Sequence, residues 1–350
     1  MKREKFFFEG RSFRLGYRVR LVLLALVLVS LWFGGGFRPL WPVEERAWTR
    51  VRNAQRMLWE TQGRLGVEQL REDDRLETGL IGVEWSDITT TLGDVRAKRT
   101  SADPLWTSRL FEWFDALALR ENDRIVVYSS SSFPALLLST LVAAEARKLD
   151  VLLAVSLGSS TWGANRMEFP WPAMHRALLD GGFVRTRAAF YMPGGRGERG
   201  SDMPPEAIRS FEALSRETGT PLVVPVDRDD AIRIKTKAMK EFSPKLLISI
   251  GGPAANLGPS ESLYPFPSGL VLPGAQRAEW GDGVACRALE AGVPVLNLLN
   301  VRALAVEAGI PWDGARFIKA RLRLQPVVAL LAAALFLVVM ALHRRWEWDG

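Results

Sequence analysis

Short apolar runs alternate with helical patterns from Leu80 onward, and this alternation most constrains the fold. The clearest run is Arg124–Tyr128 (RIVVY), which is followed by SSSSFPA and a helical pattern over Ala135–Lys148. Such alternation predicts a parallel sheet covered by helices. We therefore expect a doubly wound, mainly parallel α/β fold, a Rossmann-like three-layer sandwich. Further strands are expected at Val151–Val155, Ala188–Met192, Leu222–Val226, Leu246–Ile250 and Val293–Leu296.

The composition predicts a globular chain without a disulfide framework. Its 350 residues are 48% hydrophobic and 24% charged, which excludes disorder and allows a sizeable core. A single Cys excludes an intramolecular disulfide, and two His with one Cys are too few soft ligands for a structural zinc site. We therefore expect no metal and no cofactor.

The positive charge of the chain lies at its two ends. The formal net charge is +7, yet residues 44–315 hold 32 Lys and Arg against 35 Asp and Glu, a net charge of −3, while the flanks carry +10. A nucleic-acid-binding domain is normally basic. We therefore expect no nucleic-acid partner.

Two uncharged apolar stretches lie within the basic flanks, and we interpret both as transmembrane helices. They are Leu21–Phe37 (LVLLALVLVSLWFGGGF) and Pro326–Leu342 (PVVALLAAALFLVVMAL), each at the lower length limit for spanning a bilayer. A cleaved signal peptide is the alternative for the first stretch, because its n-region is basic and Gly34–Gly36 resembles a cleavage site. Trp32 and Phe33 instead favour an interfacial aromatic belt.

Two spans would place both termini on the same side of the membrane. Seven basic residues among the first twenty favour the cytoplasm, although four basic residues before the second stretch weakly favour the reverse. We therefore expect a cell-membrane protein whose central domain is extracytoplasmic. The expected segments are a basic N-terminus (1–20), a span (21–37), an amphipathic stalk (38–75), the α/β domain (76–315), a basic juxtamembrane segment (316–325), a span (326–342) and a C-terminal tail (343–350).

Polar loops follow several of the expected strands and are the best candidates for a ligand site. In doubly wound sheets ligands bind beyond the carboxyl ends of the strands, where hydroxyls and helix N-termini suit phosphate or carboxylate. A redundant N-cap is the structural alternative for the serine loop. The candidate ligand-binding residues from these loops are Ser129, Ser130, Ser131, Ser132, Ser159, Ser160, Asn165, Gly251, Gly252 and Asn256.

The segment Leu80–Thr100 combines a threonine run with cations and also suits an anionic ligand. The alternative is a threonine strand followed by a solvated basic turn. The candidate residues are Thr89, Thr90, Thr91, Arg96, Lys98 and Arg99.

Several catalytic motifs are incomplete. Gly195, Gly197 and Gly200 match G-x-G-x-x-G, but prolines surround them and we interpret the segment as a mobile loop. No Walker loop is present. His175, the one histidine outside the flanks, lies in a helical pattern that suits packing better than a Ser-His pair, so Lys98 is an alternative base for Ser131.

Three long motifs carry a resemblance to a known family. They are ETGLIGVEWSDITTTLGDVRAKRTSADP, SSSSFPALLLSTLVAAEA and SLGSSTWGANRMEFPWPAM. The chain closely resembles the membrane-associated poly-gamma-glutamate system protein family from about Glu77 to the last apolar stretch. The family loop usually reads Ser-Gly-Ser-Phe-Pro-Ala, whereas Ser131 stands at the glycine position here.

The resemblance implies a pathway and supplies no catalytic residues. We expect an accessory protein of poly-γ-glutamate synthesis and export, whose partners are the polymer, the membrane subunits of the synthase and export machinery, and the lipid bilayer. One alternative is a hydrolase or transferase acting on the γ-glutamyl polymer, with Ser131, Ser132 or a threonine of Thr89–Thr91 as nucleophile. Another is a cytoplasmic nucleotide- or phosphometabolite-binding regulator.

Overall fold

The computed structural model describes residues 22, 24–28, 37–258, 266–275, 278–322, 330–331 and 333–338. The chain divides into two compact units, one of Leu40–Lys319 and one of Met1–Pro39 with Ala320–Gly350. In the second unit, β1 (Phe37–Pro39) pairs antiparallel with β10 (Ala320–Leu322).

Most of the two expected spans, 21–37 and 326–342, and the tails 1–20 and 343–350 lie outside the described residues. Residues 24–28 and 333–338 of the spans are helical. Among the residues that the structure describes, no helix has both the length and the apolar character needed to cross a membrane.

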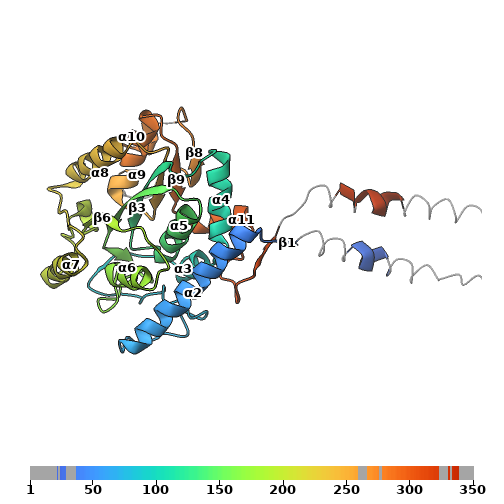
Figure 1. Ribbon diagram of the computed structural model, residues 1–350, viewed down its shortest axis with the longest axis horizontal. Coiled ribbons are helices and arrows are strands. Elements are labelled where there is room, and N and C mark those ends of the chain that lie inside the picture. Colours follow the sequence, from blue (N-terminus) through green and yellow to red (C-terminus); the bar gives the residue numbers. More distant parts are fainter. Residues whose placement is uncertain are drawn as a thin grey trace, which may run out of the picture. The chain divides into compact units, whose positions relative to one another are not determined.

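A six-stranded sheet forms the centre of the Leu40–Lys319 unit (Figure 1). Its strand order is β6-β4-β3-β7-β9-β8, and every neighbouring pair is parallel except β8 with β9. The strands are β3 (Arg124–Ser130), β4 (Asp150–Ser156), β6 (Ala188–Met192), β7 (Leu246–Ile250), β8 (Gly269–Val271) and β9 (Val295–Leu298). The expected Rossmann-like α/β fold is thus confirmed at the level of the sheet.

The strand order reverses direction beside β3. The chain runs from β3 outward through β4 to β6, and then returns to place β7 on the opposite side of β3, followed by β9. The carboxyl ends of β3 and β7 therefore border a topological switch point, which is where open α/β sheets bind ligands.

Alternating side chains of the strands feed two separate cores. Ile125 and Val127 of β3 belong to one hydrophobic cluster, whereas Val126 and Tyr128 belong to a second cluster on the opposite face of the sheet. Because side chains alternate along a strand, a sheet covered on both faces reads as a continuous apolar run, as RIVVY does. The result is a three-layer sandwich (Figure 1).

Helices on both faces complete this unit. They are α2 (Pro42–Arg64), α3 (Val95–Ser101), α4 (Trp106–Ala116), α5 (Pro134–Ala146), α6 (Trp171–Asp180), α7 (Pro205–Thr218), α8 (Arg228–Phe242), α9 (Ala254–Leu257), α10 (Val284–Glu290) and α11 (Val301–Ala308), with short 3₁₀ turns η1 (Arg196–Glu198) and η2 (Ala278–Trp280). A short parallel pair, β2 (Thr89–Thr91) and β5 (Ser159–Ser160), lies outside the main sheet.

One expected strand is wrong, and one strand of the six-stranded sheet was not expected. Leu222–Val226 makes only an isolated bridge from Leu222 to Tyr191, and Val224 and Val226 are exposed. Pro221 and Pro225 have no amide hydrogen for a sheet ladder, which explains the failure. The missed strand, β8, has only three residues and runs antiparallel at the sheet edge.

Most of the segment 38–75, which was expected to form a stalk, belongs to the Leu40–Lys319 unit. Its helix α2 packs on α4 and α5 through Val51, Ala54 and Leu58, which are fully buried. These residues recur at three- and four-residue intervals, so one stripe of the helix faces the core. The helix is therefore an integral part of the α/β unit.

A buried ion pair anchors the glycine-rich loop that precedes α7. Lys235 Nζ of α8 lies 2.9 Å from Glu198 Oε1, and both side chains are at most 2% exposed. Lys235 Nζ also donates to Asn256 Oδ1 at 3.0 Å, and the Ser156 hydroxyl donates to the Glu198 carboxylate. The loop that the sequence suggested was mobile thus has a fixed, buried acidic side chain.

Removing one member of this pair should destabilise the unit strongly. The variant Lys235→Met leaves the Glu198 carboxylate buried without its cation, and we expect a loss of about 3–5 kcal/mol of unfolding free energy. Denaturant unfolding measures this loss. Glu198→Gln combined with Lys235→Met should recover part of it.

The matched control is Lys237→Met on the same helix, where an exposed pair with Glu241 contributes at most about 0.5 kcal/mol. Equal stability of the Lys235→Met variant and the wild type would contradict the proposed role of the pair.

Candidate functional site

Three loops meet at the carboxyl ends of β3, β4 and β7, as the sequence predicted. The serine loop after β3 contacts the loop after β4, since the Ser131 amide and hydroxyl both donate to the Ser156 carbonyl, at 2.9 and 3.1 Å. On the other side, the Ser130 hydroxyl lies 3.5 Å from the Ile250 carbonyl at the end of β7. The loops therefore form one continuous rim at the switch point.

Glycine is required where the β7 loop passes the serine loop. Gly251 has φ +79°, and a Cβ atom there would lie 2.2 Å from Ser130 Oγ. Both the positive φ and the close approach exclude a larger residue without rearrangement. Gly251 thus allows the two loops to touch.

The ammonium group of Lys98 lies beneath the serine loop. Lys98 belongs to α3, which Asp94 caps by accepting the Arg96 amide hydrogen at 2.8 Å. Its side chain is 2% exposed, and Nζ donates to the Ser160 hydroxyl at 2.6 Å and to the Ser132 carbonyl. The parallel pairing of β2 with β5 brings α3 beside Ser160.

Burial lowers the pKa of Lys98 to about 7. Within the described part of the chain no carboxylate forms an ion pair with this ammonium, and the centroid of the Phe133 ring lies 3.7 Å from Nζ. An isolated buried charge is costly, so an anionic ligand would stabilise the protonated form. The neutral amine, conversely, is a base within hydrogen-bond reach of a serine hydroxyl.

We define the rim cluster as Lys98, Ser130, Ser132, Ser160 and Gly251. Ser132 connects its members, because its hydroxyl accepts the Ser160 amide hydrogen at 3.0 Å and its own amide lies 3.4 Å from Ser130 Oγ. Ser132 is half-buried, whereas Ser130 and Ser160 are each 6% exposed. Gly252, also expected here, follows Gly251 and is half-buried.

Ser131, a candidate nucleophile, faces the interior of the protein. It is fully buried, and its hydroxyl donates to the Ser156 carbonyl. Ser129 and Ser159 are likewise buried and donate to neighbouring backbone carbonyls, those of Ser130 and Ser131. A run of serines contains inward- and outward-facing members, and the sequence does not distinguish them.

Thr89 and Asn165 hold the segment before β2 in place. The Asn165 side chain accepts from the Val83 amide at 2.9 Å and donates to the Val83 carbonyl and to Thr89 Oγ1 at 2.8 and 2.9 Å. Both side chains are buried. Of the other two threonines, Thr90 donates to the Ser159 carbonyl at 3.3 Å, and Thr91 is exposed.

The three cations of α3 do not form one basic site. Arg96 is exposed and pairs with Asp94, whose pKa is lowered mainly by that hydrogen bond. Arg99 donates to the Asp73 and Glu72 carbonyls at 2.6 and 2.9 Å. Arg96 and Arg99 lie one turn apart on α3 and have acidic partners, whereas Lys98 is buried against the serine loop. The joint contact of the three cations with a polyanion stays a prediction.

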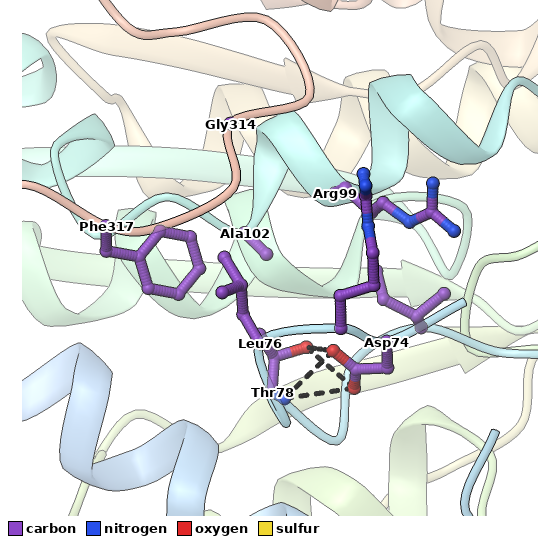
Figure 2. Close-up of a pocket in the computed structure, with 9 residues that line it drawn as sticks. Asp74, Leu76, Thr78, Arg99, Ala102, Gly314 and Phe317 are labelled. Carbon is purple, nitrogen blue, oxygen red and sulfur yellow. Dashed lines mark hydrogen bonds between the residues drawn. The ribbon is translucent and has the colours of Figure 1, made fainter. Parts of the chain in front are cut away.

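Arg99 also borders a cavity too small for a ligand (Figure 2). The cavity has a volume of about 10 Å³, close to the minimum for one water molecule. On its wall, the Asp74 carboxylate accepts the Thr78 amide and hydroxyl, each at 2.9 Å. Arg99 and Asp74 are therefore structural residues here.

Asn256 and His175 have structural roles as well. Asn256 is fully buried, accepts from Lys235, and donates to the Tyr128 carbonyl and to Ser249 Oγ at 3.2 and 3.1 Å. The ring of His175 stacks on Trp171, and its Nε2 lies 2.9 Å from the Thr186 carbonyl. Desolvation lowers the pKa of His175 to about 4, so the ring is neutral near pH 7. Its stacking on Trp171 indicates a role in packing.

The sequence missed the pairing of Lys98 with Ser160 and the Lys235–Glu198 network. Nothing in the spacing of these residues signals either contact. Among the described residues there is no group of three or more His, Cys, Asp and Glu side chains that could hold a metal ion. Comparison with family models, curated proteins and solved structures gives no match for this chain.

The lowered Lys98 pKa should make stability rise with pH. Above pH 7 folded Lys98 loses its proton, while the unfolded chain keeps it to about pH 10.5, so unfolding takes up a proton in this interval. Relative to Lys98→Met, the wild-type unfolding free energy should rise by up to about 1.4 kcal/mol per pH unit from about pH 7. Denaturant titrations across this range test it; parallel curves for the two proteins would refute it.

Proposed function

We propose that this chain is a membrane-anchored accessory protein of poly-γ-glutamate synthesis and export, and that its rim cluster binds a carboxylate of the polymer. In this account both termini are cytoplasmic and the α/β unit is extracytoplasmic at the cell membrane. The membrane subunits of the synthase and export machinery are its expected protein partners. The motif resemblance supports the pathway.

The buried Lys98 ammonium carries the proposal for the ligand. It contacts the loops after β3 and β4, where it donates to the Ser160 hydroxyl and to the Ser132 carbonyl, and it has no carboxylate partner among the described residues. A γ-glutamyl polymer carries one free carboxylate per residue, so it supplies the missing anion. The net charge of −3 over residues 44–315 disfavours bulk attraction to a polyanion, which makes a local contact the better explanation.

Exposed apolar side chains support the two anchors. The helical residues 24–28 and 333–338 belong to uncharged stretches whose flanks are basic. Exposed apolar helices of this kind are stabilised by lipid rather than water. The exposed side chains are Val22, Leu26, Val27, Leu330, Leu331, Leu335, Phe336, Leu337 and Val338.

Acyl transfer on the same polymer is the second candidate function. The 2.6 Å hydrogen bond between Lys98 and Ser160 favours it, because a lysine with a pKa of about 7 is a suitable base for a serine nucleophile. Under this account Ser160 replaces Ser131 as the nucleophile. Ser160→Ala would then abolish polymer shortening and any covalent adduct.

Removing the Lys98 ammonium should weaken polymer binding. With the purified full chain and an oligo-γ-glutamate, we expect Lys98→Met to raise the Kd at least tenfold, because a charge-assisted contact is lost. Calorimetric titration measures the Kd. The matched control is Arg96→Gln on the same helix, which removes an exposed cation and should leave the Kd unchanged.

Equal affinity of the wild type and Lys98→Met would exclude the rim cluster as the polymer site. Equal losses in Lys98→Met and Arg96→Gln would instead indicate a nonspecific charge effect.

Cysteine labelling can test on which side of the membrane the α/β unit lies. The one native cysteine, Cys286, is buried, so background labelling should be small. Arg199 is exposed in the loop before α7, and Arg199→Cys should react with an impermeant maleimide in intact cells. Labelling only after lysis would contradict the extracytoplasmic placement and favour the nucleotide-binding alternative.

A further inference from the structure

A basic groove lies along α2, away from the rim cluster. Its volume is about 390 Å³, and Arg52, Arg56, Arg316 and Lys319 line it together with the Trp48 and Phe317 rings. No Asp or Glu occurs among the described residues that line it. The cations come from two distant parts of the sequence, one on α2 and one after α11.

The cations of this groove are only partly neutralised. Arg52 donates to the Leu76 carbonyl at 2.9 Å, and its guanidinium lies 5.4 Å from the Phe317 ring centroid. Lys319 Nζ lies 2.7 Å from Glu45 in an exposed pair. Arg56 and Arg316 are exposed, and the described part of the chain provides no ion-pair partner for either.

The pKa of Arg52 reflects charges of both signs around it. Burial, and then the neighbouring charge of Arg56, lower that pKa, and the carboxylates of Asp74 and Glu77 oppose the shift in part. Like charges held together around a cavity are relieved by an anion, and two arginines bind phosphate oxygens well.

We propose that this groove binds the head group of an anionic phospholipid. Residues 320–325 connect Lys319 to the second apolar stretch. A segment of this length spans at most about 20–22 Å when fully extended, which limits the distance between Lys319 and that stretch. Cations beside a membrane segment attract anionic lipids. The proposal rests on the membrane anchoring in the proposed function, but not on polymer binding at the rim cluster.

The test uses the purified full chain in a neutral detergent. Dioctanoyl phosphatidylglycerol is titrated against dioctanoyl phosphatidylcholine as the uncharged control, with retention of lipid measured by native mass spectrometry. We expect selective binding of phosphatidylglycerol that weakens as NaCl rises from about 0.05 to about 0.5 M. Arg56→Glu with Arg316→Glu should weaken that binding at least tenfold.

The matched control pair is Arg187→Glu with Arg216→Glu, two exposed arginines outside the groove, and it should leave lipid binding unchanged. Equal binding of the two lipids, or equal losses in both double variants, would overturn the proposal. Displacement of the lipid by oligo-γ-glutamate in the wild type would also overturn it and assign the groove to the polymer. This experiment uses no variant of the rim cluster. A failure of lipid binding can therefore be distinguished from a failure of polymer binding at Lys98.

Discussion

The buried ammonium of Lys98 is the constraint on which the candidate site depends. Its hydrogen bonds connect α3 to the serine loop and to Ser160. Neither α3 nor Ser160 is part of the six-stranded sheet. Desolvation makes the charge of Lys98 costly, and two neutral oxygens compensate only in part. A site built this way favours either an anion that restores the charge or a reaction that removes the proton.

The topology explains why these groups meet. The reversal of strand order beside β3 leaves the serine loop and the Gly251 loop on the same rim, and the glycine lets them touch. The Lys235–Glu198 pair stiffens the neighbouring loop from the other face of the sheet. The rim is therefore held from both layers, which is the support that a preorganised binding site needs.

The sequence predicted the sheet better than the site. Continuous apolar runs such as RIVVY identify strands buried on both faces, and the loops after them were correctly expected to share a rim. The failures have local causes: Pro221 and Pro225 interrupt an apolar run, and Ser131 faces inward beside the more accessible Ser132. The Lys98–Ser160 contact joins residues 62 positions apart through the β2–β5 pairing, which single-sequence periodicity does not encode.

We propose that an anion of the γ-glutamyl polymer binds beside Lys98. The most direct measurement is an NMR titration of the Lys98 side chain, with and without a saturating oligo-γ-glutamate. A bound carboxylate stabilises the protonated amine, so we expect the Lys98 pKa to rise from about 7 when the oligomer is added. An unchanged Lys98 pKa at saturation would contradict it.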